Sequence, residues 1–196
     1  MPMIKVGVAT LTLRGQAQSG DRHTVMPFPD GCLVAVVDGL GHGEKAAFAA
    51  SAAIRTLETH AEEPVISLVR RCHENLRSTR GVVMSLASFS RRYATVAWLG
   101  VGNVEGIILR DSEEASRREC LLLRGGVVGN QLPRLQAAVV EIIPGDTLIF
   151  ASDGIRMEFT QDCRLWGPPQ RTADMILDRY HKSDDDALVV VAQYEG

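Results

Sequence analysis

A chain of 196 residues, 45% of them hydrophobic, is long enough for one domain to bury a core without disulfide bonds or a structural metal. Its charge is nearly balanced, with 21 Lys and Arg against 24 Asp and Glu, and no block of like charges suggests nucleic acid or a membrane surface as a partner. No segment approaches the roughly 18 consecutive apolar residues of a membrane span, and the first residues lack the apolar run of a signal peptide. We therefore expect a single domain over residues 1–196, in the cytoplasm, without nucleic acid or membrane partners.

The cysteines are scattered over the chain, at Cys32, Cys72, Cys120 and Cys163. None forms a CxxC pair or has histidines at the spacing of a zinc finger, so neither a structural zinc site nor a redox dithiol is indicated. No coiled-coil heptad is evident either, which favours a monomer.

The first part of the chain predicts two strands followed by two helices. Residues 3–13 and 31–38 are short and rich in β-branched residues, and a polar, turn-rich segment joins them. Residues 44–63 are rich in alanine and other helix formers, and residues 64–81 open with proline and close at glycine, as helices often do.

From Val82 onward the pattern returns to short apolar runs separated by Gly, Pro, Asn or Asp. A helix is expected at about residues 170–181, and residues 110–119 are expected to form a charged surface turn. The strands are predicted at residues 82–90, 93–101, 105–110, 119–124, 137–143, 146–152 and 187–194. This order indicates an α+β fold, in which two packed sheets flanked by helices would bury every element.

Aspartates followed by small residues recur at the predicted strand ends. They occur in SGD at Asp21, in VVDGLGHG at Asp38, in FASDGI at Asp153 and in SDDDAL at residues 184–186. Any one of them could be an ordinary turn or helix cap, because Asp-Gly is a frequent turn dipeptide. Their joint order is more informative, because carboxylates at strand ends can converge in space.

Such a set of carboxylates indicates a site for hard divalent cations. Oxygen ligands are those that Mg²⁺ and Mn²⁺ prefer, and a glycine such as Gly39 lets a backbone carbonyl approach a cation closely. Two cations about 4 Å apart can lower the pKa of a water molecule and neutralise phosphoryl oxygens. The pattern therefore favours hydrolysis of a phosphate ester.

The set SGD, VVDGLGHGEKAA, ATVAWLGVGN, PGDTLIFASDGI and DDDALVVV, in that order, resembles the metal-dependent protein phosphatase (PPM) family, and specifically its SpoIIE-like branch. The resemblance extends from about Lys5 to Val191. It implies an αββα sandwich of two antiparallel sheets with helices outside, and a cleft for two divalent cations, Mn²⁺ or Mg²⁺, at one end.

The resemblance also implies roles for individual residues. Asp38 would bridge both cations, Asp21 and the Gly39 carbonyl would complete one site, and Asp153 with Asp185 would hold the other. Asp184 and Asp186 remain alternatives to Asp185, because Leu188 replaces the threonine that usually fixes the register of this motif.

Two further positions near these motifs bear on the chemistry. Asn103 lies where many family members carry an aspartate for a third metal, and a neutral amide is a poor cation ligand, so we expect two tightly held cations. His42 follows Asp38 closely, and it is a candidate general acid for the leaving oxygen; the alternative is that it caps or orients the helix that begins near Gly43.

The resulting prediction is a metal-dependent phosphatase that acts on phosphoserine or phosphothreonine in a partner protein. The expected lack of an attached sensor domain is a feature that this sequence shares with the stressosome phosphatases of this branch. This resemblance implies that the substrates are phosphorylated STAS-domain scaffold proteins. The alternatives are a non-catalytic module that holds a phosphorylated partner, and a phosphatase for small metabolites. Specificity is expected on loops around the cleft, at residues 24–31 with Phe28 or at residues 125–134 with Arg134.

Overall fold

The computed structural model describes residues 2–110, 118–162 and 165–196. Its strands are β1 (Ile4–Leu11), β2 (Asp21–Phe28), β3 (Gly31–Gly39), β4 (Val82–Ser90), β5 (Thr95–Val101), β6 (Glu105–Leu109), β7 (Arg118–Cys120), β8 (Leu123–Arg124), β9 (Ala138–Glu141), β10 (Thr147–Ala151) and β11 (Ala187–Tyr194). Its helices are α1 (Glu44–Thr59), α2 (Val65–Asn75), α3 (Phe159–Asp162) and α4 (Pro169–Tyr180).

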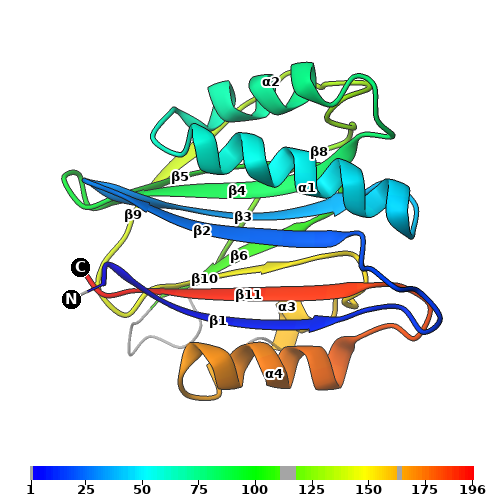
Figure 1. Ribbon diagram of the computed structural model, residues 1–196. Helices are drawn as coiled ribbons and strands as arrows, with labels where there is room; N and C mark the ends of the chain where they lie inside the picture. The colour runs from blue at the N-terminus through cyan, green and yellow to red at the C-terminus, as the bar shows by residue number, and fades with distance from the viewer. Residues whose placement is uncertain (1, 111–117, 163–164) are drawn as a thin grey trace.

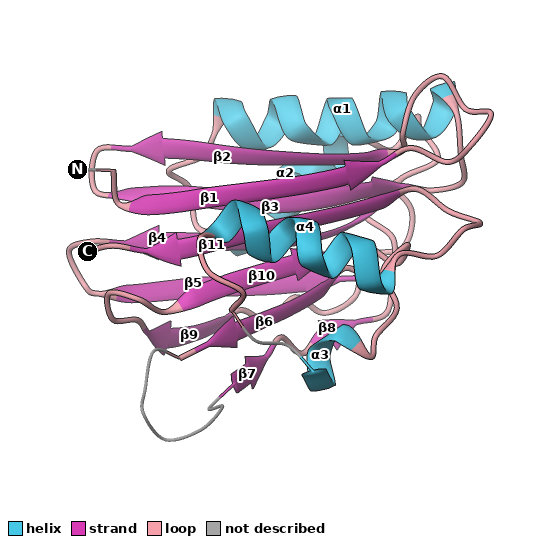
Figure 2. Cartoon of the chain, turned by 90° about the horizontal axis from the view of Figure 1, so that it is seen from below, coloured by secondary structure: helices cyan, strands magenta, loops and turns pink. Residues whose placement is uncertain are grey.

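The strands form two sheets that pack face to face, with helices on both outer faces (Figure 1). One sheet has the order β1-β11-β10-β6-β7, and the other has the order β2-β3-β4-β5-β8, with β9 paired to β5. The described strand pairs are antiparallel except for β5 with β8. Helices α1 and α2 cover the β2–β5 sheet, and α4 lies across the other sheet (Figure 2). The predicted αββα sandwich is confirmed.

Three apolar cores hold these four layers together. The first lies between the sheets, the second between α1, α2 and their sheet, and the third between α4 and the other sheet. In β3, Val34 and Val36 face the core between the sheets, whereas Leu33, Ala35 and Val37 face the helices. Both faces of a central strand are therefore buried, which explains its unbroken run of apolar residues.

The end of β3 and the start of β11 lie at the same side of the sandwich, and this arrangement positions the site. Strand β3 runs toward Asp38 and Gly39, and β11 begins just after Asp186. Both chain termini lie at the opposite end in Figure 1. The loops at the Asp38 end are therefore free to form a cleft.

Three details of the secondary structure differ from the prediction. Strand β2 (Asp21–Phe28) was missed, because its sequence DRHTVMPF has little alternation and contains a proline. The strand predicted at residues 119–124 is wrong: β7 pairs with β6 in one sheet and β8 pairs with β5 in the other. The short helix α3 was also missed, since a single turn has no detectable period.

The charged segment at residues 110–119 lies mostly outside the described residues. At the start of this segment, Arg110 is ion-paired with Glu119 and with Asp146, and the Asp146 side chain is fully buried.

In the part of the chain that the structure describes, no helix is both long enough and apolar enough to span a membrane.

Candidate metal centre

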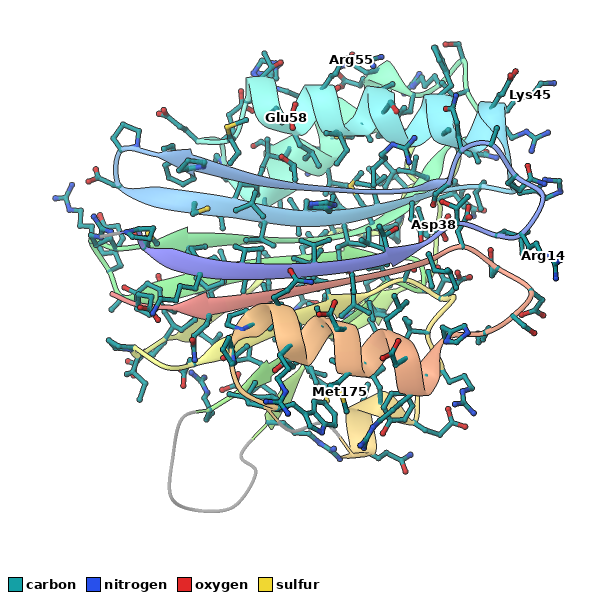
Figure 3. The ribbon with its side chains drawn as sticks, turned by 60° about the horizontal axis from the view of Figure 1, so that its bottom comes forward. Arg14, Asp38, Lys45, Arg55, Glu58 and Met175 are labelled. Carbon is teal, nitrogen blue, oxygen red and sulfur yellow. The ribbon has the colours of Figure 1, made fainter. Side chains whose placement is uncertain are left out.

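Strands β2 and β3 bring the first two aspartates of the predicted set together. Asp21 pairs directly with Asp38 in the antiparallel register, so their side chains lie on the same face of the sheet. Asp38 lies at one end of the sandwich, near the loop that carries Arg14 (Figure 3). The chain then turns through Gly39 into α1, where a Cβ atom on Gly39 would lie 2.1 Å from the carbonyl oxygen of Ala46. Only glycine allows this close approach of strand and helix.

The other sheet delivers its aspartates to the same place. Asp153 follows β10, and the run that ends at Asp186 precedes β11. A hydrogen bond joins the two sheets here: the Ser152 hydroxyl donates to the Asp21 carboxylate at 2.6 Å. The same hydroxyl oxygen accepts the backbone N–H of Leu188 at 2.9 Å, which fixes its direction.

These strand ends line an open cavity of about 550 Å³. Among its described lining residues there are four aspartates and neither lysine nor arginine. Its polar lining consists of Asp38, His42, Asn103, Asp153, Asp184 and Asp185. The cavity therefore concentrates negative charge that the described protein groups lining it do not neutralise.

The electrostatic cost of this arrangement is visible in the pKa values of the carboxyl groups. Burial, together with repulsion from Asp21 and Asp153, raises the pKa of Asp38 to about 8. Burial also raises the pKa of Asp21 to about 7, although the hydrogen bond from Ser152 opposes this shift. Burial and repulsion from Asp153 raise the pKa of Asp185 as well. Divalent cations would relieve this repulsion, and the oxygen-only donor set fits Mg²⁺ or Mn²⁺.

The three consecutive aspartates before β11 have different surroundings. Asp186 is buried, and its two carboxylate oxygens accept the backbone N–H groups of Leu13 at 2.7 Å and Gly20 at 2.6 Å. Asp186 thus anchors the loop between β1 and β2. Asp184 and Asp185 line the cavity instead, and Asp185 is the more buried of the two.

Asp153 is held in position by two neighbouring contacts. The Asn103 amide nitrogen donates to its carboxylate at 2.8 Å, and the Lys182 ammonium group donates to its backbone carbonyl at 2.6 Å. The neutral residue at position 103 therefore orients a carboxylate of the cavity, which is a function that the sequence did not reveal.

His42 is exposed and lies on the wall of the cavity, close to Asp38 in the chain. The alternative of a helix cap is wrong, because Gly43 occupies the N-cap position of α1 and no side chain caps it. The imidazole is thus available to a molecule bound in the cavity.

The structure brings the candidate ligands together to different degrees. Asp38, Asp153 and Asp185 share the cavity wall, whereas Asp21 and Gly39 are buried behind it. Within residues 2–110, 118–162 and 165–196, no three His, Cys, Asp or Glu side chains already have the spacing of a metal cage. The carboxylates are nevertheless close enough to repel one another.

Sequence reasoning missed Ser152 altogether and considered Asp186 only as an alternative ligand, not in its supporting role. Ser152 links the sheets and Asp186 anchors a loop, and both make their contacts with residues far away in the chain. The only signal for them was the small polar residue before Asp153 in FASDGI and the unusual run of three aspartates.

Comparison with known proteins agrees with this geometry. Residues 29–195 match the family described as Stage II sporulation protein E (SpoIIE). The chain belongs to the SpoIIE family. The phosphoserine phosphatase RsbX of Bacillus subtilis (strain 168) is 29% identical to this SpoIIE-family chain over 112 residues. That match covers 57% of the chain and 56% of RsbX, so it spans little more than half of that relative.

Solved structures share the fold over nearly the whole SpoIIE-family chain. One, described as "The bacterial stressosome: a modular system that has been adapted to control secondary messenger signaling", has a TM-score of 0.88 and 30% identity, covering 98% of this chain and all (100%) of its own. RsbX in complex with magnesium has a TM-score of 0.87 at 22% identity, covering 98% of this chain and 96% of its own. The catalytic domain of the phosphatase PstP, in complex with 2 manganese ions, has a TM-score of 0.73 at 17% identity, covering 98% and 99%.

Proposed function

We propose that this chain is a metal-dependent phosphatase that removes phosphate from phosphoserine or phosphothreonine in a partner protein. The observation that carries the proposal is the cavity in which aspartates from both sheets converge without a lysine or arginine among its described lining residues. A site with this excess of carboxylates binds divalent cations more favourably than it binds a negatively charged substrate alone. Hydrolysis of a phosphate ester needs cations that neutralise the phosphoryl oxygens. The name of RsbX as a phosphoserine phosphatase supports the same chemistry.

The proposed ligands of two cations, Mn²⁺ or Mg²⁺, are Asp38 as the bridge, Asp21 with the Gly39 carbonyl on one side, and Asp153 with Asp185 on the other. When bound, the cations supply an activated water molecule and neutralise the phosphoryl oxygens. Relatives of this fold have been solved with magnesium or with 2 manganese ions, which supports this cofactor.

The remaining protein groups orient this site and move a proton. Ser152 holds Asp21, and Asn103 holds Asp153, so two carboxylates keep a fixed direction. His42, on the cavity wall, would give a proton to the leaving serine or threonine oxygen. An alkoxide is a poor leaving group, and its protonation lowers the barrier to the break of the P–O bond.

The proposed substrates are phosphorylated STAS-domain scaffold proteins of a bacterial stressosome, which this phosphatase would reset after a stress signal. The support is the likeness to RsbX and to a structure whose description concerns the bacterial stressosome. We further propose that residues 1–196 act as one domain and as a monomer in the cytoplasm.

Kinetics on phosphoserine peptides and on sugar phosphates, each with Mn²⁺ and with EDTA, test the proposal. Metal-dependent hydrolysis of the peptides, with at least about 100-fold lower kcat/KM on sugar phosphates, is the expected result, since 100-fold corresponds to about 2.7 kcal/mol of transition-state discrimination. Preference for a sugar phosphate would instead identify a metabolite phosphatase. Tight binding of a phosphopeptide without any hydrolysis would identify a non-catalytic module.

A further inference from the structure

A second depression adjoins the acidic cavity. It has a volume of about 690 Å³ and is lined by Arg124, Gly125, Pro133, Arg134, Leu135 and Gln136; we call it the arginine groove. Gly125 lines both the arginine groove and the acidic cavity, so the two adjoin at this residue. A Cβ atom on Gly125 would meet nothing within 4 Å, so this shared position faces open space.

The charge of the arginine groove is opposite to that of the cavity. Arg124 and Arg134 are both exposed, and neither makes an ion pair with any residue in the described part of the chain. Arg124 donates a hydrogen bond to the neutral side chain of Gln136 at 2.9 Å. Two guanidinium groups without a protein carboxylate are well suited to bind carboxylates of another molecule.

The backbone beneath the arginines is held firmly. Val128 is fully buried and bridges to Val82, and the Gly129 N–H donates to the imidazole Nδ1 of His73 at 3.0 Å. The carbonyl oxygen of Arg124 accepts the N–H of Gly102, in the turn that carries Asn103. The arginine groove is therefore fixed relative to the acidic cavity, which lowers the entropic cost of binding a chain across both.

We propose that the arginine groove binds acidic side chains that flank the phosphorylated residue in the protein substrate. This inference rests on the proposed phosphatase function, and it selects residues 125–134 over residues 24–31 as the specificity loop. An extended acidic segment passes from the cavity, where its phosphoryl group is bound, across Gly125 to Arg124 and Arg134. Without these arginines the groove would offer no guanidinium group to the carboxylates of the segment, beside a cavity lined by four aspartates.

The test compares a phosphoserine peptide flanked by glutamates with the same peptide flanked by glutamines, and with p-nitrophenyl phosphate. The variants are Arg124→Gln, Arg134→Gln, the double variant, and the double variant with lysine at both positions. Arg55→Gln is the matched control, because Arg55 is exposed on α1, away from Asp38 (Figure 3). All variants should unfold at the same temperature as the wild type, since these side chains are on the surface.

We expect each glutamine variant to raise KM for the glutamate peptide by about 3- to 5-fold and the double variant by about 10-fold, with kcat unchanged. The glutamine peptide and p-nitrophenyl phosphate should be unaffected, the lysine variant should retain most of the preference, and the preference should shrink at high salt. Equal KM values for both peptides with the wild type, or an equal loss on all three substrates in the double variant, would overturn the inference.

The inference and the proposed function can fail separately. If the wild type hydrolyses no substrate, the phosphatase function fails, and fluorescence anisotropy with labelled, unphosphorylated peptides still measures the arginine groove. Tighter binding of the glutamate peptide than of the glutamine peptide, lost in the double glutamine variant but not in Arg55→Gln, supports the groove. Equal binding of both peptides would overturn it.

Discussion

The substitution Asp38→Asn should stabilise the metal-free protein while removing its activity. Burial and neighbouring carboxylates raise the pKa of Asp38 from 3.8 to about 8, so the folded state resists its ionisation. One pKa unit corresponds to about 1.4 kcal/mol, so a shift of this size opposes folding by at most about 6 kcal/mol at alkaline pH. Because Asp38 lines an open cavity that water can enter, we expect about 2–4 kcal/mol.

The pH dependence gives the sign of this effect. A carboxyl group whose pKa is raised in the folded state does not penalise folding below pH 3.8, and the penalty grows as pH rises from about 4 to about 8. Asp38→Asn should thus raise the melting temperature modestly at pH 5 and by about 5–15 °C at pH 8, since 1 kcal/mol shifts it by about 2–4 °C in a protein of this size.

Thermal unfolding in EDTA and in Mn²⁺, at pH 5 and pH 8, is the assay. Mn²⁺ should raise the melting temperature of the wild type at pH 8, because a ligand at 100 times its Kd stabilises by about 2.7 kcal/mol, and it should raise that of Asp38→Asn much less. A lower melting temperature for the variant in EDTA at pH 8, or the same change at both pH values, would contradict the repulsion inferred for Asp38.

Three other substitutions, one of them with a matched control, test individual parts of the site. His42→Gln should lower kcat on a phosphoserine peptide by about 100-fold but spare p-nitrophenyl phosphate, whose leaving group needs no proton; equal loss on both substrates would reject the general-acid role. Ser152→Ala should lower the free energy of unfolding in urea by about 1–3 kcal/mol, because its hydroxyl is hydrogen-bonded to Asp21 and Leu188, and an unchanged value would argue against that link between the sheets. Gly39→Ala should cost about 2 kcal/mol or more, since its Cβ would lie 2.1 Å from the Ala46 carbonyl oxygen, whereas the control Gly125→Ala should change stability by less than about 0.5 kcal/mol. A loss in Gly39→Ala as small as that in the control would show that α1 moves aside freely.

Much of the fold was predictable because its central strands are buried on both faces. The runs at β3 and β11 are apolar almost throughout, and α1 is rich in alanine where it packs on the sheet. Strand β2 was not predictable in the same way, because it lies at the edge of its sheet and most of its side chains are only partly buried. The segment from β7 to β8 could not be assigned from sequence, because Leu121 enters the core between the sheets where the chain passes from one sheet to the other.

The location of the site was predictable from the sequence, but the separate roles of its residues were not. Asp38, Asp153 and Asp185 were marked by their positions at strand ends, and the structure places all three on one cavity wall. Asp186 has the same sequence context as Asp185, yet its carboxylate binds the backbone of Leu13 and Gly20. Such contacts depend on how distant segments meet, which no local pattern records.

The most direct test of the central claim is phosphate release from a phosphoserine protein by the purified wild type and by Asp38→Asn, each with Mn²⁺ and with EDTA. Release by the wild type in Mn²⁺, abolished by EDTA and lowered at least about 1,000-fold by the substitution, is the expected result, since Asp38 is the proposed bridge between the cations. Release that persists in EDTA, or that Asp38→Asn leaves intact, would contradict a metal-dependent phosphatase centred on this cavity.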